Sequence, residues 1–411
     1  MFDLPVLNKN LARLMMVSFF LPMHVQVFSV GIACLYYLFQ AFSPKNKINK
    51  STILQAIALS SGFILCLIAI PFTPTEYRNT ILNICESKVS LLLIPIIFAL
   101  ISKETLSTIR KEQIFFVYAC IIACVIGNIR FIAHYYHIQG NLHNLTHVQY
   151  RQYLEFVTGI HPTYWGLYLS YAICILLTND AVTGGTKQII KYLMLYTLLL
   201  LLLASLAKSP IIAMVVISLH YAYTKRRQVI KSLVHVSVFA LVLITAYIFI
   251  PFFSQRVAEL SEISSGVAAT EVHSNSVNER KMIFNTDVAL LKKTWLWGVG
   301  PGRLQEMLDK NYFFYSIRNQ VNTAYYDPHN EYLWQWLSFG IIGIAISISV
   351  LLLHYYRAIK SKNILYLYLL IIFSITFFTE SVLARQHGVL LYSIFTSLFF
   401  FTNSNKENYS T

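Results

Sequence analysis

The residues best placed for chemistry form a short run, Asp327-Pro328-His329-Asn330-Glu331, directly before a long apolar segment. Asp is typical of a helix N-cap and Pro of the first helical position, so the pattern predicts a helix with His329 in its first turn. The partial positive charge of a helix N-terminus disfavours an imidazolium there. A neutral imidazole can accept a proton from a hydroxyl group, so His329 is a candidate general base. The alternative is an inert, hydrogen-bonded histidine at a water interface.

A second set of candidates is cationic. Arg280 precedes an apolar-periodic stretch typical of a helix lying on a membrane surface, and the run 297–303 (Trp-Gly-Val-Gly-Pro-Gly-Arg) follows it. Arg280 and Arg303 can hold phosphate through planar bidentate contacts, or they can extend to lipid headgroups. The glycine run lacks the strand and helix that flank a phosphate-binding loop, which favours a connecting loop.

Two further charges lie in short turns between predicted apolar helices. Lys208 lies between the apolar segments 188–206 and 210–223, and Arg385 with Glu380 occupies the turn before the last segment. A charge in such a turn is costly unless it faces water or a partner. An anionic substrate or a lipid phosphate would suit Lys208, whereas Arg385 and Glu380 could pair with each other.

Five histidines lie close together in the segment 134–161. His134 with His137, and His143 with His147, have helical spacings that place each pair on one helix face. Zinc could use such pairs, but no nearby Cys or Asp completes a ligand set. Aromatic and histidine side chains at a membrane interface are the favoured explanation, and we expect neither a metal nor another cofactor.

The composition indicates the scaffold that holds these candidates. Of the 411 residues, 56% are hydrophobic and only 12% are charged, about half the charged share of a soluble domain. Such a chain has too little charge to coat soluble domains and too much apolar surface to be disordered. The net charge of +14 comes from Lys and Arg in predicted loops, so it does not indicate nucleic-acid binding.

Apolar segments near the length of a spanning helix recur along the chain. The expected spans are two within 11–42, then 53–71, 88–101, 112–133, 161–178, 188–206, 210–223, 231–252, 331–354, 363–380 and 387–402. With a cytoplasmic N-terminus, the cytoplasmic segments hold eighteen Lys and Arg, and the short outer segments hold six. This asymmetry obeys the positive-inside rule.

The sequence therefore predicts an all-α polytopic membrane protein of about twelve spans with both termini in the cytoplasm. Residues 1–252 would form about nine spans, 253–330 an extracytoplasmic loop with surface helices, and 331–411 the last three spans. The predicted spans are nearly free of charge and the polar residues gather on the outer face. This distribution favours surface chemistry over a transporter or flippase of lipid-linked sugars.

One base among cations at the outer face suits a substrate that carries a diphosphate at membrane level, together with a hydroxyl acceptor. The stretch Asp327–Gly343, with Gly340 and Gly343, resembles the signature of the O-antigen ligase and polymerase superfamily. Arg280 with the run 297–303 is similar to the rest of that region, and 88–95 resembles an early-helix pattern there. The resemblance implies that His329 is the base and that Arg280 holds undecaprenyl diphosphate, in an inverting transfer without a metal.

The resemblance also implies contacts elsewhere. The sequence Ala207-Lys208-Ser209 stands where the family often has Arg between small residues, and His161 with Tyr164 resembles a pattern at a helix start that would line the acceptor path. We expect Lys208, Arg303 and Arg385 to contact substrate as well. The favoured activity is ligation of a glycan onto lipid A-core at the periplasmic face of a bacterial inner membrane. A polymerase of the same superfamily is the alternative.

Overall fold

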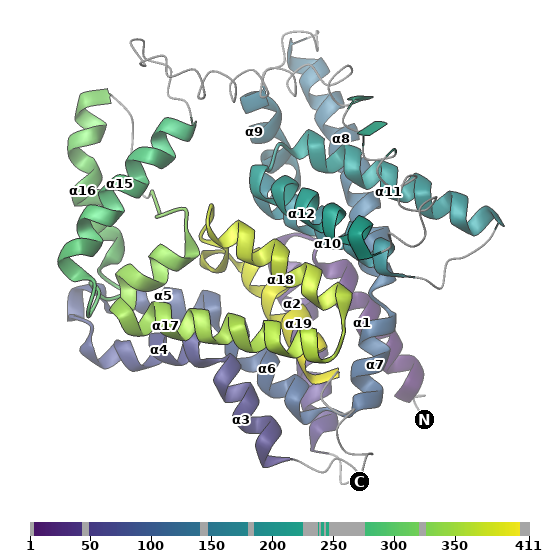
Figure 1. Cartoon of the computed structure of the whole chain (residues 1–411), viewed down its shortest axis with the longest axis horizontal. Helices are drawn as coiled ribbons and strands as arrows, with labels where there is room; N and C mark the ends of the chain where they lie inside the picture. Colours follow the sequence, from purple (N-terminus) through teal and green to yellow (C-terminus); the bar gives the residue numbers. More distant parts are fainter. Residues whose placement is uncertain are drawn as a thin grey trace. The chain divides into compact units, whose positions relative to one another are not determined.

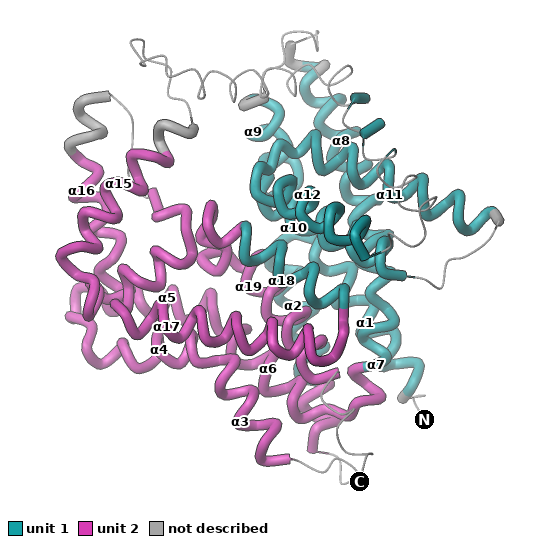
Figure 2. The backbone as a smooth tube through the Cα atoms, viewed as in Figure 1, with its two compact units in different colours: residues 1–35, 107–268, 364–375 teal, residues 36–106, 269–363, 376–411 magenta. Residues whose placement is uncertain are grey.

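The computed structural model describes residues 4–42, 49–139, 147–179, 185–224, 237, 240–241, 244–245, 276–319 and 326–402. These residues form helices and connecting loops, and they contain no strand. The chain divides into two compact units, each built from segments far apart in the sequence (Figure 2). Unit 1 comprises residues 1–35, 107–268 and 364–375, and unit 2 comprises residues 36–106, 269–363 and 376–411. The predicted division at residues 252 and 330 concerns membrane topology and stays a prediction.

Unit 1 is organised around one buried helix, α10, which packs against α8, α11 and α12 (Figure 1). His161 caps the start of α10 and Pro162 occupies its first position, as expected of a residue whose N–H would have no helical partner. The helices of unit 1 are α1 (Leu4–Ser18), the first part of α2 (Met23–Ala41), the end of α7 (Lys103–Lys111), α8 (Ile114–Gln139), α9 (His147–Thr158), α10 (Pro162–Thr178), α11 (Gly185–Ser205), α12 (Lys208–Thr224) and most of α18 (Ile364–Phe377).

Unit 2 contains the longest helix, α17, against which α4, α15 and α19 pack. Its helices are the end of α2, α3 (Lys50–Leu59), α4 (Ser61–Ala69), α5 (Arg78–Lys88), α6 (Ser90–Leu100), α15 (Ser276–Thr294), α16 (Leu304–Asn319), α17 (Glu331–Lys360) and α19 (Gln386–Thr402). Single 3₁₀ turns occupy Ile70–Phe72, Thr75–Tyr77 and Val382–Ala384.

The helix boundaries confirm several expected apolar helices and correct one. The chain breaks at Pro22, so that 11–42 forms the two helices α1 and α2 as predicted. The expected span 53–71 is broken instead, because α3 and α4 meet at Ser60 with a bend of 64°. Among the described residues, five helices are long and apolar enough to cross a membrane, or six if the bent pair is one span. The predicted segment 231–252 lies almost wholly outside these residues, and about twelve spans stays a prediction.

A small apolar core ties α15 and α16 to the first turns of α17. Its buried members are Ile283, Leu290, Leu291, Leu304, Leu308, Tyr312, Leu333, Trp334 and Leu337. The predicted helix after Arg280 is confirmed as part of α15, and its position on a membrane surface stays a prediction. The sequence analysis did not single out α16, although Leu304, Leu308 and Tyr312 are spaced four residues apart and lie on one helical face. This core fixes the start of α17, where the predicted base lies.

The glycine run, which links α15 to α16, docks into a break in α17. Gly340 has φ +63° and interrupts the helix, and a Cβ there or at Gly298 would lie within 2.7 Å of backbone atoms. Only glycine therefore fits at these two positions. The broken helical bonds are replaced by Val299 N to Leu337 O (2.8 Å), Gly300 N to Ser338 O (3.0 Å) and Ile341 N to Leu296 O (3.2 Å). The structure thus agrees with a connecting loop.

Candidate active site

His329 lies just before α17 and not within its first turn, so the predicted cap at Asp327 is wrong. The N-cap is Asn330, whose side-chain oxygen accepts a hydrogen bond from Leu333 N at 3.0 Å. His329 has φ +44°, which few residues other than glycine adopt, and a helix can begin only after it. Asp327 instead accepts the backbone N–H of His329 at 2.9 Å and closes a turn onto it.

Two carboxylates hold the imidazole of His329. Its Nδ1 lies 3.1 Å from Oε2 of Glu380 and 3.3 Å from Oδ1 of Asp327. An ionised carboxylate only accepts hydrogen bonds, so in the neutral ring Nδ1 carries the hydrogen and Nε2 keeps a lone pair. The side chain is 34% exposed, which leaves room for a ligand to approach. This arrangement provides an oriented base.

The surroundings raise the pKa of His329 above its ordinary value. Burial lowers this pKa, but the hydrogen bond to Glu380 and the negative charges of Asp327 and Glu380 raise it more, against a smaller lowering by Arg280. The expected lowering by a helix N-terminus is therefore wrong, because adjacent carboxylates outweigh it. His329 is consequently a stronger base, and one that stays protonated to a higher pH.

Arg280 joins the same network. Its NH2 group donates to Oε1 of Glu380 at 2.5 Å, so Glu380 bridges the two residues that the sequence placed in the site. A guanidinium has five N–H donors and this side chain is 39% exposed, so it can also bind an anionic ligand. The sequence analysis had considered Glu380 only as a partner of Arg385. No sequence signal linked Glu380 to His329, which lies 51 positions away.

The two residues after His329 fix the segment that carries Glu380. Asn330 donates from Nδ2 to the carbonyl of Phe378 at 3.2 Å, and Glu331 accepts the backbone N–H of Leu383 at 2.9 Å. Both side chains are buried, which strengthens these hydrogen bonds. The run His329-Asn330-Glu331 therefore supplies the base and also positions the carboxylate that orients it.

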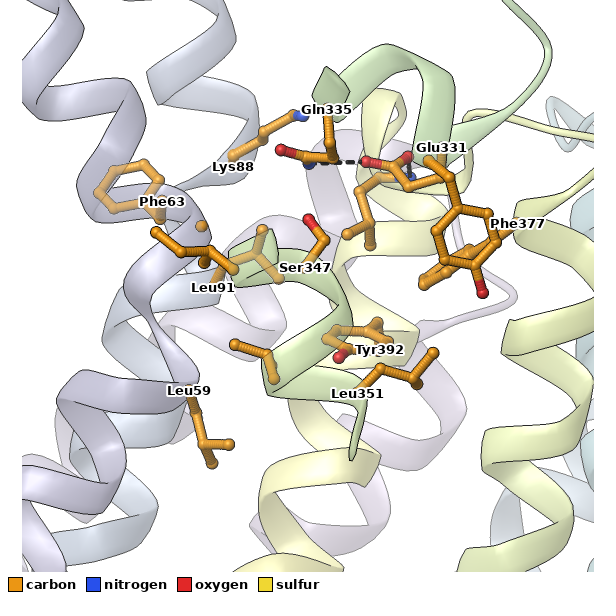
Figure 3. A pocket seen from close by; sticks show the side chains of 15 residues that line it. Leu59, Phe63, Lys88, Leu91, Glu331, Gln335, Ser347, Leu351, Phe377 and Tyr392 are labelled. Carbon is orange, nitrogen blue, oxygen red and sulfur yellow. Dashed lines mark hydrogen bonds between the residues drawn. The ribbon is translucent and has the colours of Figure 1, made fainter. Parts of the chain in front are cut away.

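A small cavity of about 60 Å³ lies beside Glu331 and is lined by Lys88 of α5 and Gln335 of α17 (Figure 3). Lys88 is buried, with Nζ 3.4 Å from the centre of the Trp334 ring, a cation–π contact. Among the described residues, neither Nζ of Lys88 nor Oε1 of Gln335 has a hydrogen-bond partner. Buried polar groups are normally satisfied, so the cavity suits water or another small polar occupant.

The sequence analysis missed one buried carboxylate, Asp287 of α15. Its Oδ1 accepts the hydroxyl of Tyr312 of α16 at 2.5 Å. Burial raises the pKa of Asp287 to about 7, with a lowering by the Tyr312 hydrogen bond, a raising by the charge of Asp327 and a lowering by His329. Asp287 therefore belongs to the electrostatic surroundings of the site. Its spacing of seven residues from Arg280, two helical turns, is the signal that could have indicated it.

The other sequence-predicted residues of unit 2 are Arg303, next to the start of α16, and Arg385, next to the start of α19. Both side chains are exposed, which leaves them accessible to a charged ligand.

The remaining candidates belong to unit 1. His161 accepts the backbone N–H of Thr163 at Nδ1 (3.3 Å) as the cap of α10, and Tyr164 is buried with its ring against His161. Lys208 is the first residue of α12 and is half-buried. Substrate contacts by these three residues stay predictions.

The histidine cluster is only partly described. His134 packs its ring against Tyr153 and Phe156. His143 and the side chain of His147 lie outside the described residues. Within the part of the chain that the structure describes, no three His, Cys, Asp or Glu side chains are grouped as metal ligands.

Fold and site together define a class: an all-α protein with several apolar helices and a histidine–carboxylate–arginine network at one helix start. Residues 193–348 match the sequence model of the O-antigen ligase family, and this segment contains Arg280, the glycine run and His329. This match agrees with the resemblance of Asp327–Gly343 to the O-antigen ligase superfamily. The match and the apolar helices support a membrane protein, and the match supports an enzyme of glycosyltransferase type. No curated protein matches the chain.

Proposed function

We propose that this enzyme transfers a glycan from undecaprenyl diphosphate to a hydroxyl acceptor at the periplasmic face of the inner membrane. The observation that carries the proposal is the hydrogen bond from Nδ1 of His329 to Glu380, which leaves Nε2 free to act as a base. Arg280 binds the other oxygen of the same carboxylate. A base and a cation held by one group suit transfer from a diphosphate donor, where a proton is removed as phosphate charge develops.

In the proposed step, the acceptor hydroxyl oxygen attacks the anomeric carbon of the donor sugar while Nε2 of His329 takes the hydroxyl proton. The bond between that carbon and the diphosphate oxygen breaks, and undecaprenyl diphosphate leaves with the electron pair. Attack from the face opposite the leaving group inverts the anomeric centre. Glu380 and Asp327 stabilise the imidazolium that forms, because an adjacent negative charge favours the charged ring.

Cationic side chains would stabilise the departing diphosphate. Arg280 can do so with the N–H groups that do not bind Glu380. We propose that Arg303 and Arg385, exposed in the same unit, and Lys208 contribute further contacts to the substrate, with His161 and Tyr164 on the acceptor path. Because these residues supply the charge stabilisation, the proposed mechanism needs no metal ion.

We favour a ligase that uses lipid A-core as the acceptor. The support is the pattern of a single base with one long loop, 253–330, before the last three predicted spans. A polymerase of the same superfamily would use the same donor contacts but would pass the growing glycan to a lipid-linked repeat unit. A transporter or flippase is less favoured, because the predicted spans are nearly free of charge and the polar residues gather on the predicted outer face.

The glycan profile of cells that lack the protein tests the proposal. Loss of all polymer from lipid A, with lipid-linked polymer retained, is the expected result and indicates a ligase. A single capped repeat unit would indicate the polymerase. Unchanged glycans would contradict both activities. The wild-type gene should restore the profile, whereas His329→Gln at equal protein level should not.

A further inference from the structure

Asp287 is an acidic residue buried between two helices, where packing alone would favour an apolar side chain. It is fully buried in the contact between α15 and α16, beside the apolar core that holds the start of α17. One oxygen accepts the Tyr312 hydroxyl, and the other, Oδ2, has no hydrogen-bond partner among the described residues. Burying a carboxylate with an unsatisfied oxygen costs folding free energy, and this cost suggests that Asp287 has a functional role.

The placement of Asp287 links it to the site. It lies two helical turns after Arg280, and residues seven apart lie on nearly the same face of a helix. Arg280 at one end of this face binds Glu380, the carboxylate that holds Nδ1 of His329. α15 packs against α17, whose start follows His329 directly. One face of α15 therefore carries both a cation and a buried acid toward the surroundings of His329.

We propose that Asp287 is a positioning carboxylate of this site, which stabilises the imidazolium that forms when His329 takes the proton of the acceptor. The inference rests on the proposed function. A negative charge favours a nearby cation, and the effect is larger where water is excluded. Asp287 is not hydrogen-bonded to His329, unlike Glu380 and Asp327, so it acts on the ring through space.

The charged groups around Asp287 determine when it is ionised. Tyr312 faces it from α16, Asp327 and His329 act on it from the segment before α17, and Arg280 lies on its own helix. Burial and the charge of Asp327 favour the protonated acid, whereas the Tyr312 hydrogen bond and an imidazolium at position 329 favour the carboxylate. A proton on His329 therefore favours the ionised form of Asp287.

Asp287→Asn separates this role from a structural one. The amide keeps the size of the side chain and can still accept the Tyr312 hydrogen bond, but it cannot ionise. The titration midpoint of His329 can be followed by NMR of histidine-labelled full-length protein in nanodiscs, with His329→Gln to assign the signal. We expect this midpoint and the acidic limb of kcat/KM to move to lower pH by about one unit, the lower end of the effect of a nearby charge.

Two further variants keep the test decisive. Tyr312→Phe retains the acid but removes the hydrogen bond that favours its ionised form, so the midpoint should move in the same direction by a smaller amount. Glu306→Gln is the matched control, because Glu306 is an acid on the same helix as Tyr312 whose hydrogen-bond partners are Tyr77 and Lys310. The control should leave the midpoint where it is.

The outcomes separate this inference from the proposed function. An unchanged His329 midpoint in an active Asp287→Asn or Tyr312→Phe enzyme overturns the inference alone, as does an equal shift in Glu306→Gln. If Asp287→Asn shifts the midpoint but the wild-type protein transfers no glycan, the proposed function is contradicted and the effect of Asp287 on His329 is supported. Loss of protein level without a shifted midpoint would show that Asp287 only joins α15 to α16, which also overturns the inference.

Discussion

Oε2 of Glu380 lies 3.1 Å from Nδ1 of His329, although the two residues are 51 positions apart in the chain. The bond fixes the tautomer and the orientation of the ring, in the way that a buried carboxylate serves a catalytic histidine in many hydrolases. Its second oxygen holds Arg280. Glu380 therefore couples the candidate base to the candidate diphosphate ligand.

Replacing this carboxylate should disable the base without removing it. In Glu380→Gln, the amide can donate to Nδ1 and so favour the tautomer that protonates Nε2. We expect kcat/KM for glycan transfer to fall by about 10²–10⁴-fold. Transfer by purified enzyme to a defined acceptor measures this. Glu86→Gln, an exposed carboxylate of α5, should retain full activity, and equal activity of the two variants would remove Glu380 from the site.

Removing the imidazole itself should have an effect of similar size. His329→Gln keeps a hydrogen-bonding side chain but cannot take a proton, so transfer should fall by about 10²–10⁴-fold while donor binding persists. His137→Gln, an exposed histidine of α8, is the matched control. If His329→Gln kept more than about a tenth of the wild-type rate, the base would have to be sought at Asp327 or His161.

The raised pKa of His329 predicts the shape of the pH profile. Only the neutral ring is a base, so kcat/KM should fall about tenfold per pH unit below this pKa, with the acidic limb of the profile above pH 6.5.

The raised pKa of His329 also predicts how the stability of the folded protein depends on pH. Because the folded-state value is raised above the unfolded one, the His329–Glu380 contact contributes fully below pH 6.5, and its contribution is lost as pH rises through the folded-state pKa.

Activity against pH and thermal unfolding against pH check these two statements separately. In Glu380→Gln the residual activity should have its acidic limb at lower pH, because the hydrogen bond and the charge that raise the pKa are gone. A limb at the same pH in both enzymes would show that another group is titrating.

The sequence was sufficient to predict several of the apolar helices and to single out two residues of the network. Hydropathy runs predicted the break at Pro22 and the helix after Arg280, because both depend on local composition. His329 and Arg280 were singled out because few residue types can act as a base or bind a diphosphate. Such properties can be recognised without knowing what surrounds the residue.

The partners of these residues could not be predicted, because they depend on tertiary contacts. Glu380 comes from a turn that Asn330 and Glu331 hold in place from another helix. The N-cap of α17 is Asn330 and not the predicted Asp327, because His329 has a positive φ. Residue types alone do not determine this backbone conformation. The raised pKa of His329 follows from the same contacts, so the predicted sign of its shift was wrong.

The glycine run should be essential for the fold. In Gly340→Ala, the new Cβ would lie 2.1 Å from the carbonyl oxygen of Leu296, and φ +63° is strained for alanine. We expect a large drop in folded protein, measured by fluorescence-detected size-exclusion chromatography. Gly31→Ala in α2 has open space around its Cβ and should behave as wild type. Normal levels of Gly340→Ala would show that the loop can leave the break in α17.

Arg280 has two possible duties that a double substitution can separate. If Arg280 only orients Glu380, then Arg280→Ala in the background of Glu380→Gln should cause no further loss, since residues that act as one unit are not additive. If it also holds the diphosphate, the double variant should show a higher KM for the lipid-linked donor than Glu380→Gln alone. We expect the second result, because the guanidinium is 39% exposed and only one of its N–H groups is needed for Glu380.

Arg280→Lys should keep the positive charge but lose the planar bidentate contact, so its activity should lie between those of wild type and Arg280→Ala. Arg78→Ala, which removes an exposed arginine at the start of α5, serves as the control for loss of positive charge. A donor KM that is the same in the double variant and in Glu380→Gln would assign Arg280 to positioning alone, and the diphosphate contact would then be tested first at Arg303 and Arg385.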